Sequence, residues 1–198
     1  VGHQPDWVWI KERTGSQTHQ LLDVVRGKIG AAASFGRLTT SGTSLTEATP
    51  GTDLGLLSLD SDGFTVGSDS AYNASSATYV SWNWKLGGAP TATNSAGAGA
   101  TPTAGSVKID GSNLGSALAG SIPATKLSAS TASGVSIVTF TGNATAGATV
   151  AHGLSSAPEL VVVKAIDATT NWTVYHSGIA SDAETDYISW DIQNDKAD

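Results

Sequence analysis

The side chains that could do acid–base or metal chemistry are few and scattered in this chain. It has four histidines and no cysteine, so thiolate metal sites and disulfides are excluded. No HExxH, paired-histidine or GxSxG pattern is present, and a metal or catalytic site would need carboxylates at ligand spacing beside a histidine. A lone histidine beside a turn more often satisfies local hydrogen bonds, so we assign no catalytic residue, no metal ligand and no cofactor, and expect a non-enzymatic protein. The four are His3, His19, His152 and His176.

The segment Asp60-Ser61-Asp62-Gly63 begins like a calcium-binding loop. A complete loop of that kind needs further oxygen ligands, a central glycine and a bidentate glutamate. Here Phe64-Thr65-Val66 follows at once and no glutamate arrives. We therefore predict a tight hairpin turn, and keep open an ion site in the Asp60/Asp62 loop completed by Asp53 or Asp69.

Six tryptophans offer a different chemistry, because aromatic faces line sites that bind small polar ligands such as sugars. Trp7 and Trp9 share one face of a predicted strand, and Trp82 and Trp84 share one face of another. These four are the candidate glycan-stacking residues. Packing between two sheets explains the same pattern and is the favoured interpretation.

The composition narrows the classes of partner. Charged residues make up 14% of the chain, against roughly 25% in ordinary soluble domains, so Ser, Thr, Gly, Asn and Ala must cover much of the surface. The net charge of −7 argues against nucleic acid and against an anionic membrane surface, both of which require a basic face. No apolar run is long enough to span a bilayer. Methionine is absent even at position 1, and we expect a processed chain or part of a longer protein.

Residues 5–23 and 158–176 match each other without a gap. Pro5-Asp6-Trp7-Val8-Trp9-Ile10-Lys11 aligns with Pro158-Glu159-Leu160-Val161-Val162-Val163-Lys164. His3 and His152 lie at corresponding places upstream. Such a repeat indicates an array of modules rather than one compact enzyme.

The apolar segments predict strands. They are short, rich in β-branched and aromatic residues, and separated by Gly, Ser, Asn and Asp, as in an all-β sandwich or barrel. The run Trp7-Val8-Trp9-Ile10 predicts a strand covered on both faces, residues 54–66 predict a hairpin, and residues 79–85 alternate with period two.

We therefore predict an all-β protein of tandem jelly-roll-like β-sandwich modules joined by a Gly/Ala/Ser/Thr-rich linker. Spaced apolar residues within the linker could clasp neighbouring subunits: Leu114, Leu118, Ile122 and Leu127. The expected parts are a first module over residues 1–88 without its opening strand, a linker over 89–133 with a short strand or helix, and the start of a second, incomplete module over 134–198.

Four motifs in order resemble a module of tailed-bacteriophage structural proteins, found especially in marine and cyanobacterial phages and often in tandem. The resemblance covers about residues 1–88 and 134–198. The Asp62-Gly63-Phe64 turn followed by Tyr79-Val80-Ser81-Trp82 also resembles the closing strands of concanavalin-like jelly rolls. The four motifs lie at residues 5–13, 21–27, 59–68 and 79–85.

The resemblance implies a non-enzymatic virion protein, a tail-fibre or appendage subunit that serves assembly and host adhesion. Its implied partners are other virion proteins and further copies of itself in a homotrimer, and its implied location is the virion. A capsid decoration or head-fibre protein is one alternative. A carbohydrate-binding module that recognises host surface glycans is another, and a polysaccharide depolymerase is the least favoured.

Overall fold

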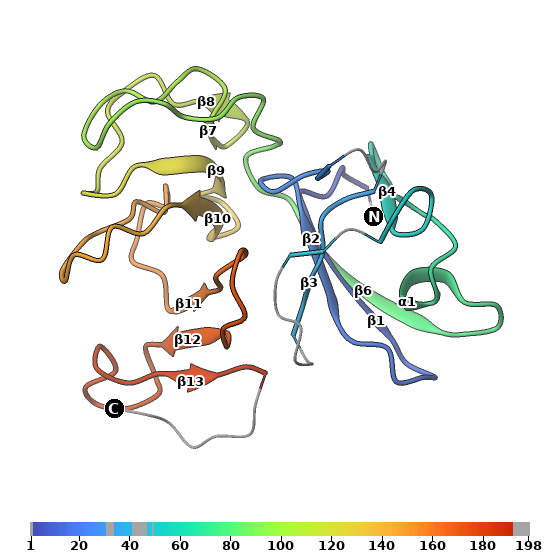
Figure 1. The fold of residues 1–198 in the computed structure, drawn as a ribbon. Coiled ribbons are helices and arrows are strands. Elements are labelled where there is room, and N and C mark those ends of the chain that lie inside the picture. The colour runs from blue at the N-terminus through green and yellow to red at the C-terminus, as the bar shows by residue number, and fades with distance from the viewer. Residues whose placement is uncertain (1, 31–33, 41–46, 49, 192–198) are drawn as a thin grey trace.

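The computed structural model describes residues 2–30, 34–40, 47–48 and 50–191 (Figure 1). The fold is all-β, as predicted, with tandem β-sandwich copies. Over the described ranges the strands form four sheets and the one α-helix is a single turn, α1 (Ser70–Asn73). None of the described helical residues could cross a bilayer as a helix.

The first sheet has the strand order β3-β2-β1-β6, and its three neighbouring pairs are all antiparallel. The predicted strand over residues 79–85 is confirmed, and the structure pairs it with β1 at the edge of this sheet. The strands are β1 (Trp7–Glu12), β2 (Gln20–Asp23), β3 (Leu38–Thr39) and β6 (Tyr79–Trp84).

Strand β1 is covered on both faces, as its unbroken apolar run predicted. Val8 and Ile10 point to one side and are 0% and 2% exposed. Trp7 and Trp9 point to the other side and pack on Leu21 and its neighbours. Because successive side chains alternate across a strand, β1 contributes to two separate cores at once.

The hairpin of β4 (Leu56–Asp60) and β5 (Gly63–Val66) forms the second layer of the first copy together with α1. Residues 60–63 make the turn that the sequence predicted. The buried members of this core come from β1, β2, β4 and α1, and they are Val8, Ile10, Leu22, Leu56, Leu59, Ala71 and Tyr72.

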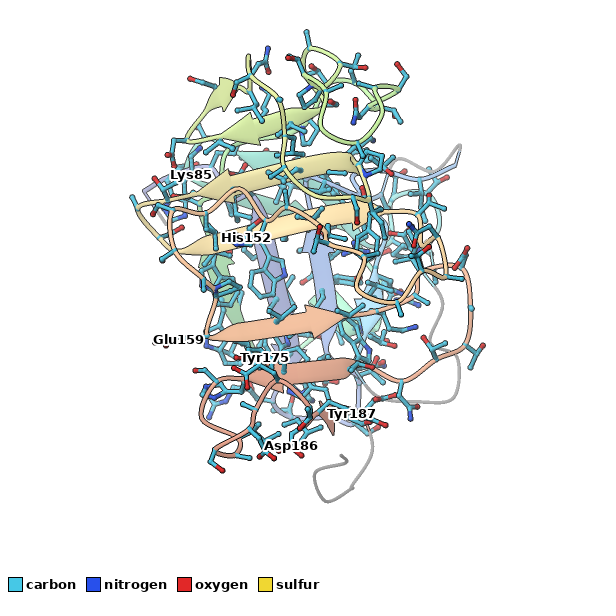
Figure 2. The ribbon with its side chains drawn as sticks, turned by 90° about the vertical axis from the view of Figure 1, so that its left-hand side faces the viewer. Lys85, His152, Glu159, Tyr175, Asp186 and Tyr187 are labelled. Atoms are coloured by element: carbon cyan, nitrogen blue, oxygen red, sulfur yellow. The ribbon has the colours of Figure 1, made fainter. Side chains whose placement is uncertain are left out.

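The rest of the chain forms two further sheets. One has the order β10-β9-β7-β8 and the other the order β11-β12-β13. Their strands cross in front of β1 and β2 in Figure 2. The strands are β7 (Val107–Ile109), β8 (Ser112–Asn113), β9 (Ala124–Ser130), β10 (Val135–Phe140), β11 (Leu160–Val163), β12 (Thr173–His176) and β13 (Ile188–Ser189).

The structure differs from the expected linker over residues 89–133. Strand β9 lies inside that segment and pairs with β7 on one side and β10 on the other. Small side chains make this possible, since Ala124 and Ala129 are 1% and 0% exposed and allow close packing around Leu127. The spaced residues Leu118 and Leu127 fill this core within the chain, and so are not free to clasp another subunit.

Gly87 joins the first copy to the second sheet. Its N–H donates to Ser128 Oγ at 3.0 Å. A Cβ at this position would lie 2.5 Å from the carbonyl oxygen of Lys108 and 2.7 Å from that of Ala129. Only glycine lets the backbone approach this closely, so the end of β6 is held directly against β7 and β9.

The sequence repeat is a repeat of structure down to its register. In the first copy Trp7 pairs with Asp23 and Val8 with Leu22. In the second copy the aligned residues pair in the same way, because Leu160 lies opposite His176 and Val161 opposite Tyr175. Strands β3 and β13 then add to the same edge of β2 and β12.

Two aligned positions of the repeat allow the contribution of burial to the free energy of unfolding to be measured. We expect Ile10→Ala to destabilise the fold by about 2–5 kcal/mol, because it opens a cavity in a closed core. Val163 aligns with Ile10 but is 46% exposed, so Val163→Ala should cost less than about 0.5 kcal/mol. Urea unfolding followed by tryptophan fluorescence measures both, and equal losses would contradict the assignment of core and surface.

Candidate functional site

Six indoles gather on the face of the first sheet that points away from the β4–β5 hairpin. We call them the tryptophan cluster. Four come from β1 and β6, where the register places Trp7 opposite Trp84 and Trp9 opposite Trp82. Two come from the second copy. The cluster consists of Trp7, Trp9, Trp82, Trp84, Trp172 and Trp190.

The rings contact one another in stacked, tilted and edge-on arrangements. Trp7 and Trp84 stack with centroids 4.2 Å apart and an interplanar angle of 22°. Trp9 lies at the centre, 5.4 Å from Trp82 and 5.2 Å from Trp190. Trp190 in turn meets Trp172 edge-on at 6.0 Å. Offset-stacked and edge-to-face pairs of this kind each add about 0.5–1.5 kcal/mol beyond their buried area.

Two indole N–H groups have specific acceptors. Trp9 Nε1 donates to His19 Nδ1 at 2.8 Å. Trp172 Nε1 donates to the carbonyl oxygen of Thr39, on edge strand β3, at 2.9 Å. Burial lowers the pKa of His19, and the nearby charge of Lys11 lowers it further. His19 therefore favours the neutral form, which is the form that can accept from Trp9.

The tryptophan cluster lies between the two copies. One member, Trp172, is buried beside Leu21 and Leu38 of the first copy. Val162 of β11 packs against these three residues. Trp9 and Val162 occupy aligned positions of the repeat, so each copy turns the same face of its sheet toward the other. At the rim, Trp82 and Trp190 remain 43% and 37% exposed. The arrangement can hold the copies together and still present aromatic surface to a ligand.

The structure brings together all four residues that the sequence predicted as glycan-stacking. Glycan binding itself stays a prediction. Trp84, Trp7 and Trp9 are half-buried, and only Trp82 is widely exposed. Trp172 and Trp190 were missed because their place in the cluster depends on how the copies dock. The alignment held one signal, since Trp172 falls on His19, which is itself a partner of Trp9.

The aspartates that the sequence suggested as ion ligands make hydrogen bonds that stabilise local structure. Asp60 Oδ2 accepts from Thr65 Oγ1 at 2.8 Å, and hydrogen bonds from Thr65 and Ser58 lower the pKa of Asp60. Asp69, a possible further ligand of that loop, instead caps α1 through Ala71 N. In the described part of the chain no three His, Asp or Glu side chains converge as a metal site would require.

Two of the other histidines make local hydrogen bonds with the backbone. His152 Nδ1 accepts from Leu154 N, and His176 Nδ1 accepts from Gly178 N, both at 3.0 Å. These are the local turn hydrogen bonds that the sequence predicted for isolated histidines. His3 Nε2 is buried without a hydrogen-bond partner, and we have no physical account of it.

A buried ion network, which sequence reasoning missed, supports β2. Arg26 Nε lies 2.6 Å from Asp23 Oδ2, and its Nη1 lies 2.8 Å from Glu47 Oε1. Burial alone would lower the pKa of Arg26, but the two carboxylates outweigh it and raise the pKa. Burial likewise raises the pKa of Tyr72 to about 12. Arg26 therefore stays charged and Tyr72 stays neutral near neutral pH, and both serve the fold.

The fold and the cluster define a tandem β-sandwich protein whose copies meet through aromatic faces. The chain belongs to a family described as a domain of unknown function, DUF7483, which matches residues 1–110 and again residues 108–198. The two matches agree with the repeat of sequence and register. Searches of curated proteins and of solved structures gave no match.

The His19 contact predicts a pH dependence of stability. The pKa of His19 is lower in the folded chain than in the unfolded one, so the unfolded chain binds more protons as the pH falls through the unfolded value of about 6.5. We therefore expect the free energy of unfolding to fall between pH 7.5 and pH 5.5. His19→Gln keeps an acceptor for Trp9 but removes the titration, so urea unfolding of this variant should show a smaller fall. An identical fall in both proteins would contradict the prediction.

Proposed function

We propose that this chain is a non-enzymatic structural protein of a tailed-bacteriophage virion, a tail-fibre or appendage subunit built from tandem β-sandwich copies. The observation that carries the proposal is the direct packing of two copies of one domain through aligned faces. A fibre or appendage must keep its successive modules in a fixed orientation along its length. Modules that bury side chains against each other suit that task better than modules on a flexible tether.

Further support comes from the resemblance of residues 5–13, 21–27, 59–68 and 79–85 to phage structural modules. All four motifs fall on elements of the first copy, in β1, β2, the β4–β5 hairpin and β6. The composition also fits an extracellular or virion protein, because charged residues are only 14% of the chain. Homotrimer formation and contacts with other virion proteins belong to the same proposal.

Purified particles of the phage that encodes this chain test the proposal. We expect antibodies raised against the recombinant chain to label an appendage by immunogold electron microscopy, and quantitative mass spectrometry to find a few copies per appendage. Many tens of copies spread over the head would instead indicate the capsid decoration alternative. Absence of the chain from particles that are washed and intact would contradict a virion role.

A second candidate function, recognition of host surface glycans, is favoured by the exposed rim of the tryptophan cluster. Trp82 is 43% exposed and contacts Trp9, which is anchored by His19. An exposed indole that is held in place by a neighbouring ring can stack on a sugar ring with little loss of side-chain entropy.

A glycan array probed with the chain tests that candidate. We expect Trp82→Ala to weaken binding to any positive glycan by about tenfold, a factor that corresponds to about 1.4 kcal/mol. Tyr187→Ala is the matched control, because Tyr187 is a 42% exposed aromatic residue outside the tryptophan cluster. Equal binding by both variants, or no positive glycan, would leave the cluster with packing as its role.

A further inference from the structure

One face of the repeated β-hairpin is buried in the first copy and exposed in the second. In the first copy this face of β1 and β2 carries Val8, Ile10 and Leu22, which are at most 2% exposed. In the second copy the aligned residues of β11 and β12 are Val161, Val163 and Tyr175. Val161 and Val163 are 38% and 46% exposed, and Tyr175 is partly exposed. A face that forms a closed core in one copy is therefore uncovered in the other.

The first copy shows what covers such a face. The hairpin β4–β5 supplies Leu56 and Leu59, and α1 supplies Tyr72, all in one cluster with Val8 and Ile10. Strand β6 then returns and pairs with the free edge of β1 over six residues. All of these elements lie between residues 56 and 84. In the described residues of the second copy, β13 is the one strand that follows β12.

A buried carboxylate marks the same site in a second, independent way. Asp6 is 2% exposed, and its Oδ2 accepts from Leu86 N at 2.7 Å and from Gly88 N at 3.2 Å. It thereby fastens the chain that leaves β6. Glu159 is the aligned residue of the second copy. It is exposed at the start of β11 (Figure 2). There its carboxylate could accept hydrogen bonds from the corresponding pair of N–H groups of a docked segment.

The edge of β11 is also open. Within the described ranges β11 pairs only with β12, and β10 only with β9. The two strands lie next to each other in both figures without forming a ladder. Leu160 at the start of β11 is 52% exposed. An open edge beside exposed apolar side chains is a template for strand addition.

We propose that β11 and its exposed face form a docking site for a polypeptide segment of this same domain family, with the pattern of residues 50–88. The segment would pair antiparallel to β11 as β6 pairs with β1. Its hairpin would cover Val161 and Val163, and its final N–H groups would bind the Glu159 carboxylate. This inference rests on the internal repeat and is independent of the proposed virion function.

The probe is a labelled synthetic peptide with the sequence of residues 50–88, added to the full chain. We expect saturable binding of one peptide per chain by fluorescence anisotropy. Hydrogen-exchange mass spectrometry should show slower exchange over residues 159–163 in the complex. Exchange over β1 should stay the same, because the first copy already holds its own covering segment.

Chain variants then locate the contact. Val161→Asp combined with Val163→Asp should abolish binding, and Glu159→Ala should weaken it by about tenfold. Leu54→Asp is the matched control, since Leu54 is 38% exposed in the first copy and outside the proposed site. Because the substituted positions are exposed, near-UV circular dichroism should show an unchanged fold.

Three results would overturn the proposal. The first is no binding of the peptide by the wild-type chain. The second is binding that survives the Val161→Asp/Val163→Asp change. The third is self-association of the chain alone in sedimentation analysis that this double change abolishes, because it would assign the surface to a second copy of the chain instead.

Discussion

The constraint on which the structure depends is that β1 must be buried on both of its faces. Val8 and Ile10 close the core under the β4–β5 hairpin, while Trp7 and Trp9 form the contact with the second copy. A strand with period-two alternation can serve two layers only if both layers are present. The internal sandwich of the first copy and its packing on the second copy are therefore set by one six-residue segment, and a shift of register would disrupt both.

Much of the first copy follows from its sequence, and the reasons are local. The unbroken run from Trp7 to Ile10 indicates a doubly covered strand, and the residues of the turn between Asp60 and Gly63 indicate a hairpin. The repeat predicted the β11–β12 hairpin as well. The strand β9 could not be predicted in this way, because Leu127 is its one large apolar residue. The side chains around Leu127 are those of Ala124, Ser128 and Ala129, which are buried but too small to give a clear apolar pattern.

The candidate site likewise has a part that the sequence predicted and a part that only the structure shows. The sequence showed that Trp7 and Trp9 share one strand face and that Trp82 and Trp84 share another. The structure adds the register that places Trp7 opposite Trp84 and Trp9 opposite Trp82. The addition of Trp172 and Trp190 depends on the docking of two sheets, and so on tertiary contacts that no local pattern encodes. Likewise, Asp6 looks like an ordinary surface carboxylate in the sequence. Only the structure shows that it accepts two backbone N–H groups from residues at the far end of its copy.

The stacked pair of Trp7 and Trp84 also has a consequence for how the first copy folds. The β1–β2 hairpin is local and can form early, whereas β6 must return across the whole intervening chain, and closing a loop of that length carries an entropy cost. The indoles of Trp7 and Trp84 come within 4.2 Å only after that return. Their electronic transitions then couple, so the molecule contains an intrinsic optical signal for the return of β6 to β1.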